Sequence, residues 1–536
     1  GDRSVAIGVG ALENQNFTTS TTTGNTAVGF TALQENTTGT NNTGIGYAAL
    51  ESNTTGQINV AIGKNCLNAN TTGGANVAIG ADTLDANTTA DHNIAIGYLS
   101  LTANTTGTQN TAVGSNSMIA NTTGQLNVAM GYGALDANTT ASQNTAIGHT
   151  ALTSCTTASN NTAVGYAALS ATSTGNGQNS AFGAYALEET TTGELNTAVG
   201  YEALEKNTTA SGNTAVGWNS LNGNTIGTRN VAIGTTSLAN NVAGDRNVAI
   251  GYQSLKTMSQ ATNTSSYNVG IGYSAGFSIT DGQLNTAIGG LALDAATTAD
   301  SNTALGYIAA TSITTGSNNT CIGRSAGASI STATSNTCVG YAAGDDLTTG
   351  IRNIVIGTGA DAGATGGNDR IVIGRDVDGT ANDRITLGVA SNIAELDLNG
   401  SDTSWAASSD ERLKENINDS QAGLFFVNDL RPVTYDWRKK KDISPELENY
   451  HEADSEERIH GEKDHTYHGF VAQEVQEVLA NHSEVKNGLG LIKERDDGVL
   501  TAAPSALVPV LVKAIQELSS QVESLKQEIN DMKGGN

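Results

Sequence analysis

A 17-residue period runs through most of this chain and limits its possible folds more than any other feature. Aligned copies open at Asn25, Asn42 and Asn59 and continue at this spacing, with single steps of 18 residues to Asn179 and 21 residues to Asn268. About 21 copies follow the pattern N-T/V-A-V/I-G-Y-x-A-L-x-x-N-T-T-G-x-x. Such a period is the signature of a solenoid, in which one unit cannot bury its apolar face alone.

Each copy predicts a short β-strand followed by turns. The segment N-T-A-V-G alternates in polarity as a strand does, and N-T-T-G is typical of a turn. A glycine in every copy and many β-branched residues argue against a helix. The copies therefore become rungs about 4.8 Å apart, and some twenty of them would form a rod on the order of 100 Å long.

The third position of each copy is always small and needs its own explanation. Ala fills it at most copies, Gly at some, as at Gly44, and Val355 is the largest residue found there. This restriction predicts close approach of another layer, either from the same rung or from a second chain. The fourth position is instead large and apolar, as at Ile7, Met130 and Phe182.

Composition excludes several classes of function. The formal net charge of −26 argues against a nucleic-acid partner. No signal peptide or apolar membrane span is visible, so we expect no membrane insertion. Four cysteines give no disulfide framework, and Cys321 and Cys338 are interpreted as small buried fillers. The sequence predicts neither a cofactor nor a metal site, because its His residues lack a tight ligand spacing.

The position after the strand glycine is often aromatic, and it also accepts Lys64, which indicates exposure. A line of aromatic rings could stack against sugar rings, or it could be a structural ladder. The repeated Asn-Thr-Thr matches a glycosylation sequon, as at Asn36 and Asn53, but it also suits a tight turn. An ice-binding threonine array is a further alternative. The candidate binding residues are Tyr47, Tyr98, Tyr132, Tyr166, Tyr201, Trp218 and Tyr252.

The N-x-A-V/I-G units resemble the head repeats of trimeric autotransporter adhesins over about residues 1–357. The resemblance implies a parallel β-roll that winds as a trimer. We accordingly expect a repeat fibre over residues 1–360. Residues 361–408 are interpreted as degenerate rungs and a linker, in which the segments 369–374 and 383–388 resemble two last rungs.

The last part of the chain carries three motifs in order: SDERLKENI at residues 409–417, GFVAQEV at 469–475 and LVPVLVKAIQEL at 507–518. Together they resemble the intramolecular chaperone auto-processing domain of phage tailspikes and tail fibres. The resemblance implies trimerisation, followed by self-cleavage between Ser408 and Ser409. Ser409 would be the nucleophile, Lys414 its base and His468 an assisting group. By spacing alone, Ser409 could simply cap a helix.

Residues 505–536 predict a coiled-coil helix behind a small α+β domain at 409–504. Branched residues and Leu alternate by three and four from Val508 to Met532. By the usual rule this seam favours two strands, whereas the family resemblance implies three.

The repeat pattern and the two family resemblances together predict a mostly β protein: a trimeric parallel β-roll or solenoid, a small α+β chaperone domain and a C-terminal parallel coiled coil. We expect a homotrimeric adhesion fibre of a virion tail that binds a cell-surface glycan or protein receptor, with one single-turnover self-cleavage and no external substrate. The alternatives are a bacterial cell-surface adhesin or filament that uses the same chaperone, a glycan-degrading tailspike enzyme and an ice-binding solenoid. No recurring carboxylate pair supports the enzyme.

Overall fold

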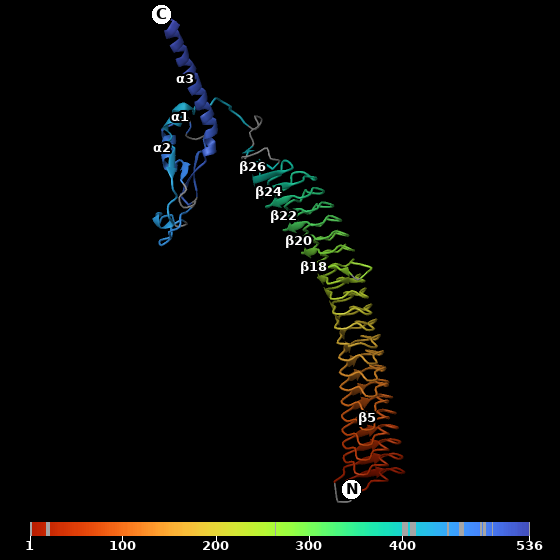
Figure 1. The fold of residues 1–536 in the computed structure, drawn as a ribbon. Helices are drawn as coiled ribbons and strands as arrows, with labels where there is room; N and C mark the ends of the chain where they lie inside the picture. Colours follow the sequence, from red (N-terminus) through yellow and green to blue (C-terminus); the bar gives the residue numbers. More distant parts are fainter. Residues whose placement is uncertain are drawn as a thin grey trace. The chain divides into compact units, whose positions relative to one another are not determined.

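A computed structural model describes residues 3–17, 22–262, 264–398, 406–407, 414–447, 450–459, 466–482, 485, 489–495 and 497–534. The chain divides into two compact units, Gly1–Ser408 and Ser409–Asn536. The first unit is a β-solenoid and the second is a small α+β unit that ends in a long helix (Figure 1). The predicted fold class is confirmed in these elements. Among the described helices, none has the length and apolar character needed to cross a bilayer.

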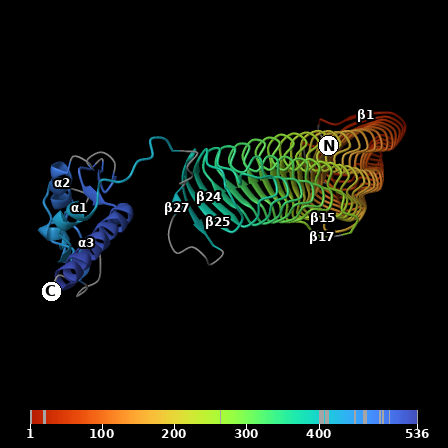
Figure 2. The same cartoon turned by 90° about the horizontal axis from the view of Figure 1, so that it is seen from above.

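Each rung contributes one short strand to a single 25-stranded sheet (Figures 1 and 2). Successive strands pair in parallel with equivalent positions opposite one another, as between Ala163 and Ala181. The 21-residue step adds a small second pairing between β15 (Gly244–Asp245) and β17 (Thr264–Ser265). The three-residue strands are β1 Val5–Ile7, β2 Thr26–Val28, β3 Thr43–Ile45, β4 Val60–Ile62, β5 Val77–Ile79, β6 Ile94–Ile96, β7 Thr111–Val113, β8 Val128–Met130, β9 Thr145–Ile147, β10 Thr162–Val164, β11 Ser180–Phe182, β12 Thr197–Val199, β13 Thr214–Val216, β14 Val231–Ile233, β16 Val248–Ile250, β18 Val269–Ile271, β19 Thr286–Ile288, β20 Thr303–Leu305, β21 Thr320–Ile322, β22 Thr337–Val339 and β23 Ile354–Ile356.

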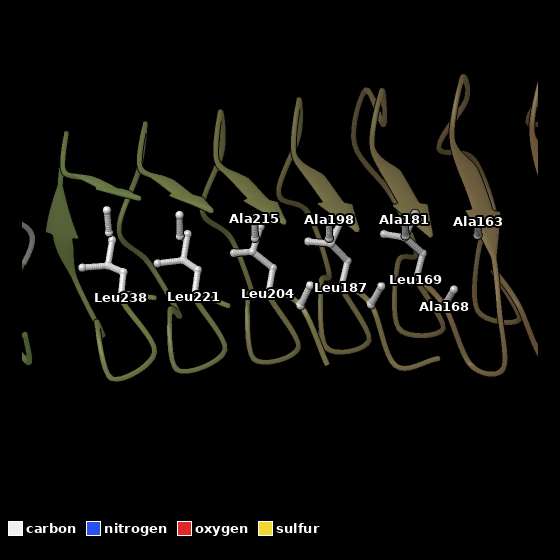
Figure 3. Packing of buried hydrophobic residues seen from close by; sticks show 14 of the residues in the cluster. Ala163, Ala168, Leu169, Ala181, Leu187, Ala198, Leu204, Ala215, Leu221 and Leu238 are labelled. Atoms are coloured by element: carbon white, nitrogen blue, oxygen red, sulfur yellow. The ribbon is translucent and has the colours of Figure 1, made fainter. Parts of the chain in front are cut away.

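The small third position points into the core of its own chain. Ala181, Ala198 and Ala215 are fully buried and form a column that faces the buried leucines of the rungs (Figure 3). Leu187 and Leu204 point toward this column. The close approach predicted at this position therefore comes from within the rung rather than from a second chain.

The asparagine that opens each copy forms a buried ladder along the solenoid. The Asn42 backbone N–H donates to Asn25 Oδ1 (2.9 Å), and its side-chain amide donates to the Gly56 carbonyl (2.8 Å). The same pattern repeats at the other end, where the Asn353 N–H donates to Asn336 Oδ1 (2.9 Å). Because these side chains are fully buried, the ladder supplies partners for backbone groups that water cannot reach.

The asparagine of the Asn-Thr-Thr turn forms a second buried ladder. Asn53 Nδ2 donates to Asn36 Oδ1 (2.8 Å) and to the Gly56 carbonyl (3.1 Å). The Thr37 hydroxyl donates to the Thr54 carbonyl of the next rung (3.0 Å). The amide and the first hydroxyl are thus used inside the fold, which supports the turn over the sequon and ice-binding interpretations.

In the late rungs, glycine replaces the buried leucine. A larger apolar side chain from the turn, three residues later, fills the space. A Cβ at Gly327 would lie 2.5 Å from Cys321 Sγ and 2.8 Å from Ile330 Cδ1. One rung later, Gly344 stands at the leucine position, and Leu347 of the turn is fully buried in its place. Cys321 is buried as predicted, and glycine is needed here because the sulfur and the isoleucine occupy the leucine volume.

Two six-residue strands continue the sheet beyond the regular repeats. β24 (Arg370–Arg375) pairs in parallel with β23, and β25 (Arg384–Val389) pairs in parallel with β24. β26 (Asn392–Asp397) then pairs antiparallel with β25, followed by β27 (Ala406–Ala407). Arg370 stands at the asparagine position, and its guanidinium donates to the Gly379 carbonyl (3.0 Å) and to Asn382 Oδ1 (3.0 Å). Arg370 thereby ends the first asparagine ladder.

The second unit packs two short helices and three-residue strands around the start of the long helix. Phe426 of α1, Val475 of α2 and Val510 of α3 lie in its core, each at most 3% exposed. The elements are α1 Leu424–Asp429, β28 Val433–Tyr435, the 3-10 turn η2 Lys440–Asp442, β29 Tyr467–Gly469, α2 Ala472–Asn481, β30 Ile492–Glu494, β31 Leu500–Ala502, the 3-10 turn η3 Pro504–Leu507 and α3 Val508–Gly534.

Candidate functional site

The residues predicted to carry self-cleavage lie at the start of the second unit. Ser408 and Ser409 lie outside the described residues. Lys414 is the first described residue of this unit, and its side chain is exposed. The segment from Lys414 to Gln421 is exposed throughout, and the first buried residue after it is Ala422. The cleavage segment therefore precedes the packed part of the unit.

His468 lies at the centre of β29 and faces Thr434 of the antiparallel strand β28. Its neighbours Tyr467 and Gly469 are partly buried, whereas the His468 side chain is exposed. Tyr435 stacks on Tyr467 with ring centroids 5.9 Å apart, which fixes this pair of strands. The strand thus presents the imidazole on the surface, and its catalytic role stays a prediction.

Two polar pairs in this unit were missed at the sequence level. His482, which is 2% exposed, lies at the end of α2, and its Nε2 is 2.8 Å from Asp429 Oδ2 of α1. Arg431 forms a two-pronged contact with Glu474, and its Nε donates to Glu474 Oε2 over 2.8 Å. The Arg431 guanidinium holds the pKa of Glu474 below its usual value. Both pairs tie residues of α2 to α1 or to the residues just after it, and no motif spacing points to either.

The predicted coiled-coil seam lies along one helix, α3, and its apolar side chains are exposed. Val510 and Ala514 face the core of the unit, whereas the seam residues lie on other faces. The exposed seam residues, between 41% and 72% accessible, are Val508, Leu511, Ile515, Leu518, Val522, Leu525, Ile529 and Met532. An exposed apolar seam with this spacing is typical of a helix that forms a coiled coil with other helices.

The solenoid also carries an exposed apolar face. The second and fourth positions of the repeat are the first and last residues of each three-residue strand, and they point away from the core. In the three-residue strands from β1 to β23, these positions carry only Thr, Ser, Val, Ile, Leu, Met or Phe. Fourth-position side chains that are 36% to 60% exposed are Ile7, Ile45, Ile62, Ile96, Met130, Phe182, Val199, Ile233, Leu305, Ile322 and Ile356. In a chain with net charge −26, an uncharged apolar face of this length is a candidate interface.

The aromatic residues after the strand glycine are exposed as predicted, and several of them stack. The rings of Tyr132 and His149 lie 5.2 Å apart at 23°, and those of His149 and Tyr166 lie 5.3 Å apart at 17°. The seven candidate binding residues are each between 45% and 54% exposed. Stacking between rungs covers ring faces at Tyr47, Tyr132, Tyr166 and Tyr252 and supports the structural ladder there, while sugar binding stays a prediction.

The stack changes direction at Tyr185. This ring lies 5.2 Å from Tyr166 at 69° and 5.7 Å from Tyr201 at 86°. Partial burial, with Tyr166 and Glu188 nearby, raises the pKa of Tyr185. Partial burial and repulsion by Glu205 raise the pKa of Glu188. Aromatic rings at right angles beside carboxylates distinguish this part of the ladder from the stacked parts.

Among the described residues, the carboxylate oxygens of Asp345, Asp346 and Asp361 lie within 4.8 Å of one another. Asp361 is buried, and its oxygens accept the backbone N–H groups of Asp346 (2.8 Å) and Ala362 (2.5 Å). Burial raises the pKa of Asp361 to about 6, although these two hydrogen bonds oppose the rise. No spacing in the sequence indicates this group, because Asp361 lies one rung beyond Asp345 and Asp346.

Comparison with known families places a match over residues 409–484, where the chain is similar to the family described as chaperone of endosialidase. No curated protein matches the chain. The match begins at the residue where the two compact units divide, and it includes Lys414 and His468. This family implies self-cleaving chaperone activity. The chain is thus a long β-solenoid of about 17-residue repeats that carries a C-terminal chaperone-of-endosialidase domain.

Proposed function

We propose that the protein is a homotrimeric adhesion fibre of a phage tail, wound in register by its C-terminal domain and then released from that domain by one self-cleavage between Ser408 and Ser409. The two units have separate roles in this proposal. The solenoid is the mature fibre, and the second unit is a folding device that acts once.

One observation carries the proposal: the chain exposes two long apolar surfaces, the strand face of the solenoid and the seam of α3. Three identical chains related by an axis along the rod would bring the same strand face of each copy together. The seam would bring the three α3 helices together in the same way. The chaperone-of-endosialidase family is associated with trimeric fibres, which supports three copies over the two that the seam residues favour.

The proposed cleavage needs an activated hydroxyl. The Ser409 Oγ attacks the carbonyl carbon of Ser408 while Lys414 takes its proton. The peptide C–N bond then breaks as Lys414 returns this proton to the leaving nitrogen, which gives an ester and the free amine of Ser409. Water then hydrolyses the ester and leaves a carboxylate on Ser408. A lysine acts as a base only where burial lowers its pKa. Because Lys414 is exposed in the single chain, the proposal makes its burial a consequence of assembly.

Expression of the full chain should test this directly. Cleavage would divide the 536 residues into pieces of 408 and 128 residues. Ser409→Ala and Lys414→Ala should each give one uncleaved trimer, because the nucleophile or its base is missing. Mass spectrometry of the small piece should identify Ser409 as its first residue.

Ser408→Ala is the matched control, since it changes the neighbouring serine and leaves the nucleophile in place. It should still give two pieces. Two pieces from Ser409→Ala would remove this residue from the mechanism. A wild-type chain that sediments as a monomer would contradict the trimer.

The receptor-binding role rests on the aromatic ladder. We propose that a glycan contacts the stretch around Tyr166, Tyr201 and Trp218, because the turned Tyr185 interrupts the stacking there and leaves ring surface open to a sugar. The neighbouring Glu188 and the net acidity favour neutral or amino sugars over acidic glycans.

A glycan array probed with the cleaved trimer should show binding that Tyr201→Ala and Trp218→Ala weaken. Tyr252→Ala is the matched control, because Tyr252 stacks on Tyr273 at 12°. Equal loss in all three variants would contradict a local site. Binding confined to sialylated or sulfated glycans would contradict the charge argument.

A further inference from the structure

Glu517 of α3 holds the residues that open α1. The Leu424 backbone N–H donates to Glu517 Oε2 over 2.7 Å. Gly423 is buried against the same carboxylate, so a Cβ at Gly423 would lie 2.4 Å from Glu517 Oε2 and 2.7 Å from its Cδ. A glycine is therefore needed here because the carboxylate occupies the place of a side chain. This contact joins residues that are 93 positions apart.

Glu517 stands between two faces of the same helix. Val510 and Ala514, two turns and one turn earlier, pack into the core of the unit and are at most 4% exposed. Ile515 and Leu518 flank Glu517 in sequence and are 66% and 49% exposed on the apolar seam. Partner helices that cover the seam would fix the rotation and position of α3. They would thereby also fix the position of Glu517.

The contact also lies close in sequence to the cleavage segment. The chain from Lys414 to Gln421 is exposed, whereas Ala422 and Gly423 are buried. Lys414 lies ten residues before Leu424, so the position of Leu424 limits where the proposed base can lie. Holding Leu424 in place restricts the positions that Lys414 can take. Restricting the positions of a reacting group is one way in which a protein accelerates a reaction.

We propose that Glu517 is a positioning residue that couples assembly of the α3 helices to self-cleavage, by holding Gly423 and Leu424 where the segment from Ser409 to Lys414 can react. This inference rests on the proposed function. The inference adds one contact to that function: the contact of Glu517 with Leu424, through which the assembled α3 helices would affect the cleavage segment. Glu517 takes no part in the proton transfers.

The test follows newly synthesised full chain by pulse labelling, with trimers separated from monomers on native gels and cleavage timed within the trimer fraction. Glu517→Ala should cleave about 10-fold more slowly, as expected for loss of one hydrogen bond to a charged group. Gly423→Ala should slow cleavage similarly, since its methyl group displaces the carboxylate. Glu517→Gln keeps an acceptor oxygen and should stay within about threefold of the wild type.

Two controls separate positioning from general damage. Lys513→Ala removes the ion pair to Glu517 Oε1 (3.8 Å) but leaves the Leu424 contact, so it should cleave normally. The double variant of Gly423→Ala and Glu517→Ala should be no slower than either single variant, because both remove the same contact.

Several outcomes would overturn the inference. These are wild-type cleavage by Glu517→Ala, equal slowing by Glu517→Gln, multiplied effects in the double variant, or loss of trimers in Glu517→Ala. The last result would place the contact in assembly rather than in positioning. If the wild-type chain itself forms trimers without cleaving, the proposed function fails, and the inference fails with it.

Discussion

Removing one asparagine from the middle of the first buried ladder should open the solenoid locally. Asn127 is fully buried in the rung of β8. Its side-chain oxygen accepts the Asn144 backbone N–H (3.0 Å), and its amide donates to the Ala141 carbonyl (2.9 Å) and to Asn110 Oδ1 (3.1 Å). Asn127→Ala removes all three contacts at once.

The three contacts do not cost the same. The Asn144 N–H loses its acceptor and stays buried, which costs about 1–3 kcal/mol. The Ala141 carbonyl keeps the donor from Asn138 (3.1 Å), and Asn110 Oδ1 keeps the Asn127 N–H (3.1 Å), so each of these losses costs about 0.5–1.5 kcal/mol. The sum is about 2–6 kcal/mol for opening the rungs around β8 and β9.

Amide hydrogen exchange followed by mass spectrometry is the appropriate assay, because a long repeat array opens locally rather than in one step. Protection of the peptide that contains Asn144 should fall between about 30-fold and 10⁴-fold. Peptides beyond residue 300 should be unchanged. Thr123→Ala is the matched control, since this exposed threonine lies four residues away, and it should shift protection by less than about threefold.

A second variant, Asn127→Asp, tests the same ladder through its pH dependence. The new carboxylate can accept the Asn144 N–H, but it faces the Ala141 carbonyl and Asn110 Oδ1 without a donor, so its pKa should rise in the folded state. Protection should then be lower at pH 7 than at pH 4, where the carboxyl is protonated. If Asn127→Ala matches Thr123→Ala, the buried ladder does not stabilise the solenoid as we argue.

Two further predictions concern the solenoid surface and its last rungs. Met130→Asp places a charge on the exposed strand face and should convert trimers to monomers or aggregates in sedimentation analysis. Thr123→Ala is the control and should remain trimeric. A trimeric Met130→Asp variant would show that the trimer interface lies elsewhere. Because burial raises the pKa of Asp361 from 3.8 to about 6, the folded state binds this proton more tightly than the unfolded state, and the stability of the last rungs should fall by up to about 3 kcal/mol as the pH rises from 4 to 7. Hydrogen exchange of β23 to β25 measures this, Asp361→Asn should remove the dependence, and a flat wild-type profile would contradict it.

Much of the solenoid follows from the sequence, because local rules and repetition act together. The period places equivalent residues opposite one another, so the register of Ala198 against Ala215 needs no tertiary information. Positions that alternate along a strand must face opposite sides. The segments 369–374 and 383–388 resemble the repeat although the period is lost there, and they contain the parallel strands β24 and β25.

The direction of each face could not be read from the pattern. Alanine at the third position fitted either a core or a contact between chains, and only the packing against Leu187 and Leu204 places it in the core. That placement turns the larger fourth position, such as Met130, outward. The antiparallel return of β26 was also missed, because the repeat ends before it.

In the second unit the sequence indicated the motifs and the helix seam, since both are continuous along the chain. Tertiary structure alone decided the contacts between distant segments: His482 with Asp429, 53 residues apart, and Glu517 with Leu424, 93 residues apart. A seam is visible in sequence because it repeats every three or four residues. A single hydrogen bond between two distant residues has no period, so only the folded chain shows it.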